Sequence, residues 1–203
     1  MIDDTVLAAA EGYAREFFAG DASGHDFQHT LRVFLLARRI AADEGADAGI
    51  VCLAALLHDV DDAKLSPETT ESLGNARAFL DEHGVGERDA EAVLTAIREV
   101  SFSKNGDAMP SSLESACVRD ADRLDAIGAI GVGRTFAFGG SHGRAMHDPT
   151  GVDPTTTVQH FYDKLFKLKG MMCTAAGQRL AEGRDATMHA FLEAFLREWD
   201  GLA

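Results

Sequence analysis

The chain has 203 residues, of which 46% are apolar and 26% charged, a composition typical of a globular protein with a sizeable core. Its 19 Lys and Arg residues against 33 Asp and Glu residues leave a formal net charge of −14. Because binding to a nucleic-acid polymer depends on neutralising phosphates with cations, this charge argues against such a partner and against a helical transcription-factor-like domain. It also repels anionic substrates at long range, so a phosphate ester would need a cation where it binds.

The N-terminus and the cysteines indicate a reducing compartment. No basic segment followed by an apolar stretch opens the chain, and the longest apolar run, 50–57, is too short to span a bilayer. Cys52 and Cys117 lie in apolar runs, which is typical of small core residues. We therefore expect a cytoplasmic protein without a membrane partner, and the sequence leaves a homo-oligomer open.

Apolar residues at helical spacing predict a series of helices. In chain order they cover 5–18, 27–44, 48–58, 68–83, 87–100, 111–125, 126–137, 158–169 and 174–199. The segment 48–58 is apolar nearly all round and rich in Ala, which favours a central buried helix over a buried strand. Residues 138–156 are polar and Gly-rich, and a loop of this length is typically functional or mobile. The predicted fold class is all-α, a compact helical bundle, and a single domain over 1–203 is the simplest organisation because no linker or repeat interrupts it.

The predicted buried helix ends in a His-Asp pair, His58 and Asp59. A charged pair that closes an apolar run is costly to bury unless it is paired or bound to a cation. His29 lies near the start of the second predicted helix, and Asp122 ends another largely apolar segment. Two imidazoles and two carboxylates suit a divalent metal with open positions. Each residue alone has an ordinary structural explanation, but the order His29…His58-Asp59…Asp122 on successive helices is far more specific.

This order resembles the signature of the HD-domain metal-dependent phosphohydrolases. Four phrases resemble those of a bacterial HD subfamily associated with nucleotide hydrolysis: G-H-D-F-Q-H-T-L-R-V, A-A-L-L-H-D-V-D-D-A-K, D-A-D-R-L-D-A-I-G-A-I-G-V-G-R-T-F and H-F-Y-D-K-L-F-K-L-K-G. The likeness spans roughly residues 20–200. It implies a compact helical bundle of the HD-domain type, with metal ligands at His29, His58, Asp59 and Asp122. Two-metal members have further histidines between the H-D pair and the last Asp, where this chain offers His83, so we expect one metal.

One divalent ion is therefore the predicted cofactor. We expect Mn²⁺, although the ligand set also admits Mg²⁺, Co²⁺, Ni²⁺, Fe²⁺ or Zn²⁺. The resemblance implies a phosphohydrolase with a small nucleotide substrate, and first among its reactions the cleavage of an NTP or dNTP to a monophosphate and pyrophosphate. A nucleoside 5′-monophosphate phosphatase is the second interpretation. A non-catalytic, metal-stabilised nucleotide-sensing module is the third, and it would need no carboxylate beside an open metal position.

In related HD hydrolases, an acidic residue just beyond the H-D pair orients or deprotonates the attacking water. By this resemblance Asp62 is the predicted general base, with Asp61 as the alternative. A solvated acidic loop explains the same two residues equally well.

Six side chains are candidates for contacting substrate phosphates: Arg32, Lys64, Arg123, Arg134, His160 and Lys164. Arg32 shares a helix face with His29, where its guanidinium could hold phosphate oxygens bidentately or pair with a ligand carboxylate. His160 and Lys164 share a face at i, i+4. The resemblance implies that their helix borders the site, whereas an exposed charged face is the simpler interpretation.

Two residues just before His29 are candidates for supporting the ligands. His25 could donate a hydrogen bond behind them or act as an acid towards the leaving group. Asp26 is better explained as the cap of the second helix. In the 138–156 loop, Arg144 would reach the phosphates only if the loop closes over the substrate.

Overall fold

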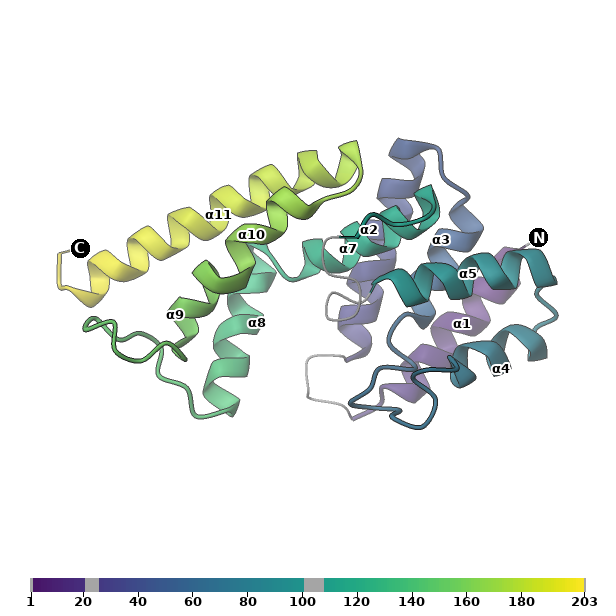
Figure 1. Cartoon of the computed structure of the whole chain (residues 1–203), viewed down its shortest axis with the longest axis horizontal. Coiled ribbons are helices and arrows are strands. Elements are labelled where there is room, and N and C mark those ends of the chain that lie inside the picture. The colour runs from purple at the N-terminus through teal and green to yellow at the C-terminus, as the bar shows by residue number, and fades with distance from the viewer. Residues whose placement is uncertain (1, 21–25, 101–107, 203) are drawn as a thin grey trace. The chain divides into compact units, whose positions relative to one another are not determined.

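The structure is a computed structural model that describes residues 2–20, 26–100 and 108–202. Within these ranges the chain is helical and contains no strand, which confirms the predicted all-α class (Figure 1). Its contacts cluster into two compact units, Met1–Asp122 and Arg123–Ala203. No helix among the described residues combines the length and the apolar character that crossing a membrane requires.

The first unit is built around one buried helix. Its helices are α1 (Asp4–Phe17), α2 (Phe27–Glu44), α3 (Ala48–Leu57), α4 (Gly74–Glu82), α5 (Glu87–Val100) and most of α7 (Leu113–Asp125). Helices α1, α2 and α5 each pack against α3. Because α3 is apolar on nearly every side, it can be surrounded in this way, and residues 51–57 are all buried, Cys52 among them. The predicted central buried helix is therefore confirmed, and its start is capped by Asp47.

Helix α7 is tied to α3 and α5 by polar contacts. The Arg119 side chain, which is buried, donates from Nε to the Glu99 carbonyl at 2.8 Å and from Nη1 to the Ala108 carbonyl. Near the start of α7, Glu114 accepts a hydrogen bond from the Asp47 backbone N–H at 3.1 Å. These contacts fix α7 on both sides, and Asp122 lies one turn beyond Arg119.

The second unit begins with the last residues of α7. It continues with α8 (Gly128–Ser141), α9 (Thr157–His160), the π-helical turn η1 (Phe161–Leu165), α10 (Phe166–Leu168), the 3₁₀ turn η2 (Lys169–Met171) and α11 (Ala175–Trp199). Helix α11 packs along α8. Aromatic rings from both helices meet there, with Phe136 of α8 contacting Phe191 and Phe195 of α11 at centroid distances of 5.7 and 5.5 Å.

Gly128 is the first residue of α8 and follows the end of α7 by three positions. It has φ +77°, a left-handed conformation, and a Cβ there would come within 2.9 Å of the Arg184 side chain. Arg184 in turn donates to the carbonyl of Leu124 in the last turn of α7. Only glycine satisfies both the backbone and the space at this position, which explains one glycine of the D-A-I-G-A-I-G-V-G phrase.

Two predicted boundaries were wrong, and one predicted helix is interrupted. The helix predicted over 68–83 begins only at Gly74, because the hydroxyl of Thr70 donates to the Ser66 carbonyl and holds the preceding residues in turns. Leu73 then adopts a left-handed conformation, φ 53° and ψ 46°, at a cost of about 1–2 kcal/mol. The helix predicted over 158–169 is divided by a π-helical turn, and α8 extends to Ser141, into the predicted loop.

Candidate metal centre

The four predicted ligands lie in the first unit, and each of them is at or near one end of a helix. His29 is in the first turn of α2, where the Asp26 carboxylate accepts its backbone N–H at 2.8 Å and caps the helix. His58 and Asp59 follow directly after α3, and Asp122 lies near the end of α7. His25 lies outside the described residues.

The structure brings donor atoms of these four residues together. His29 Nε2 and His58 Nε2 are 3.3 Å apart. Asp59 Oδ2 lies 3.4 Å from the first nitrogen and 3.3 Å from the second. Asp122 Oδ1 lies 3.5 Å from His29 Nε2 and 4.0 Å from His58 Nε2. We call these four residues the ligand cluster.

The spacing of the ligand cluster fits a common metal ion. Bonds of about 2.1 Å at tetrahedral angles separate neighbouring donor atoms by about 3.4 Å, close to most of the observed distances. Two imidazole nitrogens and two carboxylate oxygens are donors that Mn²⁺, Fe²⁺ and Zn²⁺ accept. Among the described residues, His29, His58 and Asp59 form the one group of three or more such side chains with ligand atoms all within 4.8 Å of one another. Metal ligation by the cluster stays a prediction that this geometry supports.

His58 is oriented by a hydrogen bond behind the cluster. Its Nδ1 lies 2.9 Å from the carbonyl of Ala55, one turn earlier in α3. A proton on Nδ1 for this bond leaves the lone pair of Nε2 directed at the cluster, as a metal ligand requires. Burial by itself lowers the pKa of His58, but the charge and hydrogen bond of Asp59 outweigh it, so the pKa lies above the ordinary value. The Asp59 carboxylate thus favours a positive charge on the His58 side of the cluster.

The ligand cluster is buried on the histidine side and open on the carboxylate side. The side chains of His29 and His58 are 3% and 1% exposed, whereas those of Asp59 and Asp122 are 14% and 31% exposed. An ion bound there would keep an accessible side near Asp122. Such an opening is what distinguishes a catalytic from a closed structural metal site.

The two candidate bases differ in environment. Asp61 is buried, and its two carboxylate oxygens accept the backbone N–H groups of Asn75 and Ala76, each at 3.0 Å. These contacts favour a structural role for Asp61 over proton transfer. Asp62 is half-buried, and its Oδ1 accepts the Lys64 backbone N–H at 2.9 Å, in a turn that leaves the other carboxylate oxygen for a further contact. Asp62 thus stays the predicted base.

The candidate phosphate-binding residues are distributed over both units. In the first, Arg32 is half-buried one turn after His29, and Lys64 is exposed in the loop after the H-D pair. In the second, Arg123 donates to the Met171 carbonyl and Arg134 pairs with the buried carboxylate of Asp125 at 2.7 Å. The contacts of Arg123 and Arg134 favour structural roles, and a substrate role for either stays an unsupported prediction.

His160 and Lys164 belong to a basic group in the second unit. Burial is the main cause that lowers the pKa of His160, and the charges of Lys164 and Arg144 lower it further. The charge of Asp163 acts in the opposite direction, and the lowered pKa favours a neutral imidazole, so attraction for an anion would come from Lys164 and Arg144. Binding of substrate phosphates by His160 and Lys164 remains a prediction.

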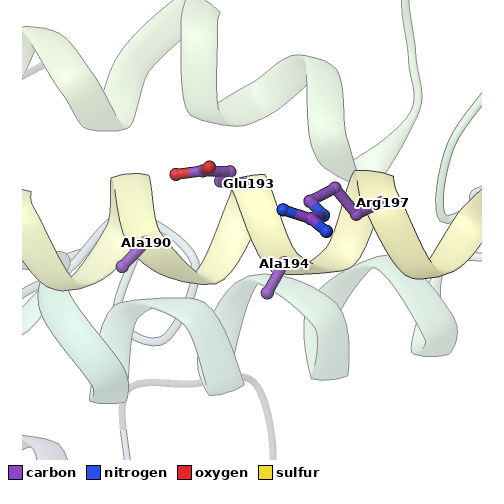
Figure 2. A pocket seen from close by; sticks show the side chains of 4 residues that line it. All are labelled: Ala190, Glu193, Ala194 and Arg197. Carbon is purple, nitrogen blue, oxygen red and sulfur yellow. The ribbon is translucent and has the colours of Figure 1, made fainter. Parts of the chain in front are cut away.

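A shallow hollow on α11 offers no comparable chemistry. Figure 2 shows the four residues that line it, Ala190, Glu193, Ala194 and Arg197. It contains one carboxylate and one guanidinium, and neither histidine nor cysteine. The ligand cluster is therefore the stronger candidate for a functional site.

Sequence reasoning missed the partners that fix the cluster from behind. The Ala55 carbonyl carries no signal in the sequence, because any residue three positions before His58 on a helix would present one. Asn75, which contacts the segment after Asp59, lies across a long loop from it. Neither has a residue type or spacing that distinguishes it from its neighbours.

A helical unit carrying clustered His and Asp side chains of this kind defines the class of HD-domain proteins. The family model of the HD domain matches residues 26–127, which include all four cluster residues. Bacillus subtilis YpgQ is 38% identical over 188 residues, covering 92% of this chain and 88% of YpgQ.

Solved structures agree. An HD-superfamily hydrolase from Bacillus thuringiensis superposes with a TM-score of 0.80 and 38% identity over 96% of each chain. Bacillus subtilis YpgQ in complex with ADP superposes with a TM-score of 0.81 and 34% identity, over 97% of this chain and all of the other. The present chain belongs to the HD-domain family and has the fold of the HD-superfamily hydrolases.

Proposed function

We propose that this protein is a divalent-metal-dependent phosphohydrolase that acts on nucleotides and cleaves nucleoside triphosphates to a monophosphate and pyrophosphate. The observation that carries the proposal is the convergence of His29, His58 and Asp59 at donor-atom distances of 3.3 to 3.4 Å, with Asp122 Oδ1 3.5 and 4.0 Å from the two imidazole nitrogens on the more exposed side. A divalent ion held by them, which we expect to be Mn²⁺, would polarise a phosphoryl oxygen and lower the pKa of a nearby water.

The chain's own residues have distinct tasks in this reaction. The ligand cluster holds the cation that a protein of charge −14 needs in order to bind a polyphosphate. Asp62 accepts a proton from the attacking water, whose oxygen bonds to the α-phosphorus. The bond from that phosphorus to the α–β bridging oxygen breaks, and the electron pair leaves with pyrophosphate. Arg32, which lies one turn after His29 on α2, would contact phosphate oxygens.

A nucleotide is the substrate class that the comparisons support. YpgQ, which is 38% identical to this chain over nearly its whole length, has a crystal structure in complex with ADP. A diphosphate nucleotide carries the phosphoanhydride bond and the charge that the proposed site is suited to bind. The comparisons support a nucleotide in general, and the choice of the α–β bond as the bond cleaved is part of our proposal.

Product analysis after incubation with MnCl₂ tests the proposal. Nucleoside triphosphates and monophosphates would each be incubated with the wild type, the variant Asp59→Asn and the matched control His83→Ala, and the products followed by ³¹P NMR. We expect pyrophosphate and monophosphate from the wild type and from the control, whose imidazole stacks on Phe79 instead of joining the cluster. The variant Asp59→Asn should be inactive.

The other outcomes identify the alternatives. Free phosphate released only from monophosphates would replace the proposal with a nucleoside 5′-monophosphate phosphatase. A metal-loaded wild type that turns over no nucleotide would contradict the enzymatic function and favour a nucleotide-sensing module.

A further inference from the structure

Asp61 lies two residues after Asp59 but serves another helix. Its carboxylate is buried and accepts the backbone N–H groups of Asn75 and Ala76 at 3.0 Å each. These groups belong to the first turn of α4 (Gly74–Glu82), where N–H groups have no partner within the helix and the helix dipole favours an anion. Asp61 therefore caps α4 from fourteen residues earlier in the chain.

The side chain of Asn75 returns the contact. Its Nδ2 donates to the carbonyl of Val60 at 2.8 Å, and Ser66 Oγ and Thr69 Oγ1 lie 3.2 Å from the same nitrogen. The two residues that follow Asp59 are thus both held by the start of α4, one through its backbone and the other through its side chain. We call this set of hydrogen bonds, formed by Asp61 and Asn75, the Asp61–Asn75 junction.

The backbone of Leu73 is held in an unfavourable conformation next to the Asp61–Asn75 junction. Leu73 directly precedes α4, is buried, and has a left-handed backbone, the one such non-glycine residue in the described part of the chain. A left-handed conformation at a bulky residue is retained only where the surroundings determine it strongly. The apolar side chain of Leu73 cannot accept a hydrogen bond from the first turn of α4, and the Asp61 carboxylate accepts it instead.

Asp59 needs such support because α3 ends before it. The helix stops at Leu57, and residues 58–61 form turns in which the Asp62 N–H donates to the Asp59 carbonyl at 3.0 Å. A turn at the end of a helix is less constrained than the helix itself, yet the cluster distances require Asp59 Oδ2 to be fixed within a few tenths of an ångström.

We propose that the Asp61–Asn75 junction positions Asp59 for metal binding, so that Asp61 and Asn75 are positioning residues of the centre. The inference rests on the proposed function, because it requires that the ligand cluster binds a metal. It also gives Asp61 a task that replaces the alternative role of general base, since both of its oxygens are occupied by α4.

Metal affinity distinguishes positioning from simple stabilisation. Isothermal titration with MnCl₂ alone would be done on wild type and Asn75→Ala at a temperature where circular dichroism shows both fully folded. We expect Kd for Mn²⁺ to rise about 10- to 100-fold in Asn75→Ala, as for other residues that orient metal ligands. The variant Asp61→Asn, which keeps the shape but replaces one acceptor oxygen, should shift Kd in the same direction and serves if Asn75→Ala does not fold.

The matched control is Asp47→Ala. Asp47 caps the opposite end of α3, through Gly49 and Ile50, so its loss lowers stability without touching the H-D turn. We expect its Kd to stay within about twofold of wild type. Folded Asn75→Ala and Asp61→Asn proteins with wild-type Kd would overturn the inference. Absence of nucleotide turnover in the metal-loaded wild type would instead refute the proposed function, while the difference in Kd would still report on the junction.

Discussion

At the residue scale, His58 connects the buried helix to the ligand cluster through its two ring nitrogens. Nδ1 is held by the Ala55 carbonyl at 2.9 Å, and Nε2 lies 3.3 Å from both His29 Nε2 and Asp59 Oδ2. The ring therefore has one orientation in which both contacts are made. The hydrogen bond to the Ala55 carbonyl thus holds the ring with Nε2 directed at the cluster, as a metal ligand requires.

Asp62 is the residue whose role is most open to a direct test. Asp62→Asn should retain Mn²⁺ affinity within about twofold, because the residue is outside the ligand cluster. It should lower kcat for nucleotide hydrolysis by about 10²- to 10⁴-fold, because the amide cannot accept the proton from water. Initial rates and a metal titration measure both quantities, with the exposed Asp81→Asn as control. Wild-type kcat in Asp62→Asn would remove it as the base.

Asp148 gives a prediction for pH in the loop of the second unit. Hydrogen bonds from the Thr150 hydroxyl, and then from backbone N–H groups including those of Asp153 and Thr150, lower its pKa from 3.8 to about 2. Because the pKa is lower in the folded state, ionised Asp148 stabilises the folded loop at pH values above the unfolded-state pKa. This contribution is lost as the pH falls from about 4 to about 2. A ¹³C NMR titration of the carboxyl group should show a midpoint near 2. A midpoint close to 3.8 would contradict the hydrogen-bonded turn.

The residues that the sequence singled out differ in how much could be known beforehand. His58 and Asp59 stood out because they end an apolar run, and His29 and Asp122 because of their order along the chain. The role of Asp61 could not be predicted, since its partners are backbone N–H groups of α4 that any sequence would present there. Long-range capping depends on where the chain returns, which periodicity does not describe.

At the element scale, regular amphipathic helices were predictable and irregular backbone was not. The bounds of α2 and α5 agree with their periodicity, and the start of α4 does not. Thr69 and Thr70 continue a helical pattern, but their hydroxyls hydrogen-bond to the Ser66 carbonyl and compete with the helix. The π-helical turn at Phe161–Leu165 likewise has no periodicity that would distinguish it from an α-helix.

Two glycines of α8 should respond oppositely to alanine. Gly128→Ala should lower the free energy of unfolding by about 1–3 kcal/mol, because φ is +77° and the new Cβ meets the Arg184 side chain. Gly133→Ala, with no atom within 4 Å of the added Cβ, should raise it by about 0.5–1 kcal/mol through helix propensity. Urea unfolding monitored by circular dichroism measures both. Equal effects of the two substitutions would contradict the left-handed conformation and close packing of Gly128.

At the scale of the whole molecule, the candidate metal centre belongs to one of two compact units. The cluster residues all lie in Met1–Asp122, and the HD-domain match, 26–127, ends just beyond that unit. The basic group with His160 and Lys164 lies in the second unit. That the chain acts as a single domain over 1–203 stays a prediction.

The net charge of −14 would give a bound metal a role for the molecule as a whole. A polyphosphate approaching this protein is repelled at long range, so affinity must come from cations at short range. An ion in the ligand cluster would supply such a charge beside Asp122, whose side chain is 31% exposed.

Titration of the metal-free protein with MnCl₂, followed by calorimetry, tests the central claim most directly. The wild type and the four single variants His29→Ala, His58→Ala, Asp59→Asn and Asp122→Asn would be compared with the control His83→Ala. We predict one ion per wild-type chain, wild-type affinity in the control and a loss of about 100-fold or more in each cluster variant, because each removes a direct ligand. A folded wild type that binds no Mn²⁺, or a cluster variant that binds it as tightly as wild type, would contradict the account.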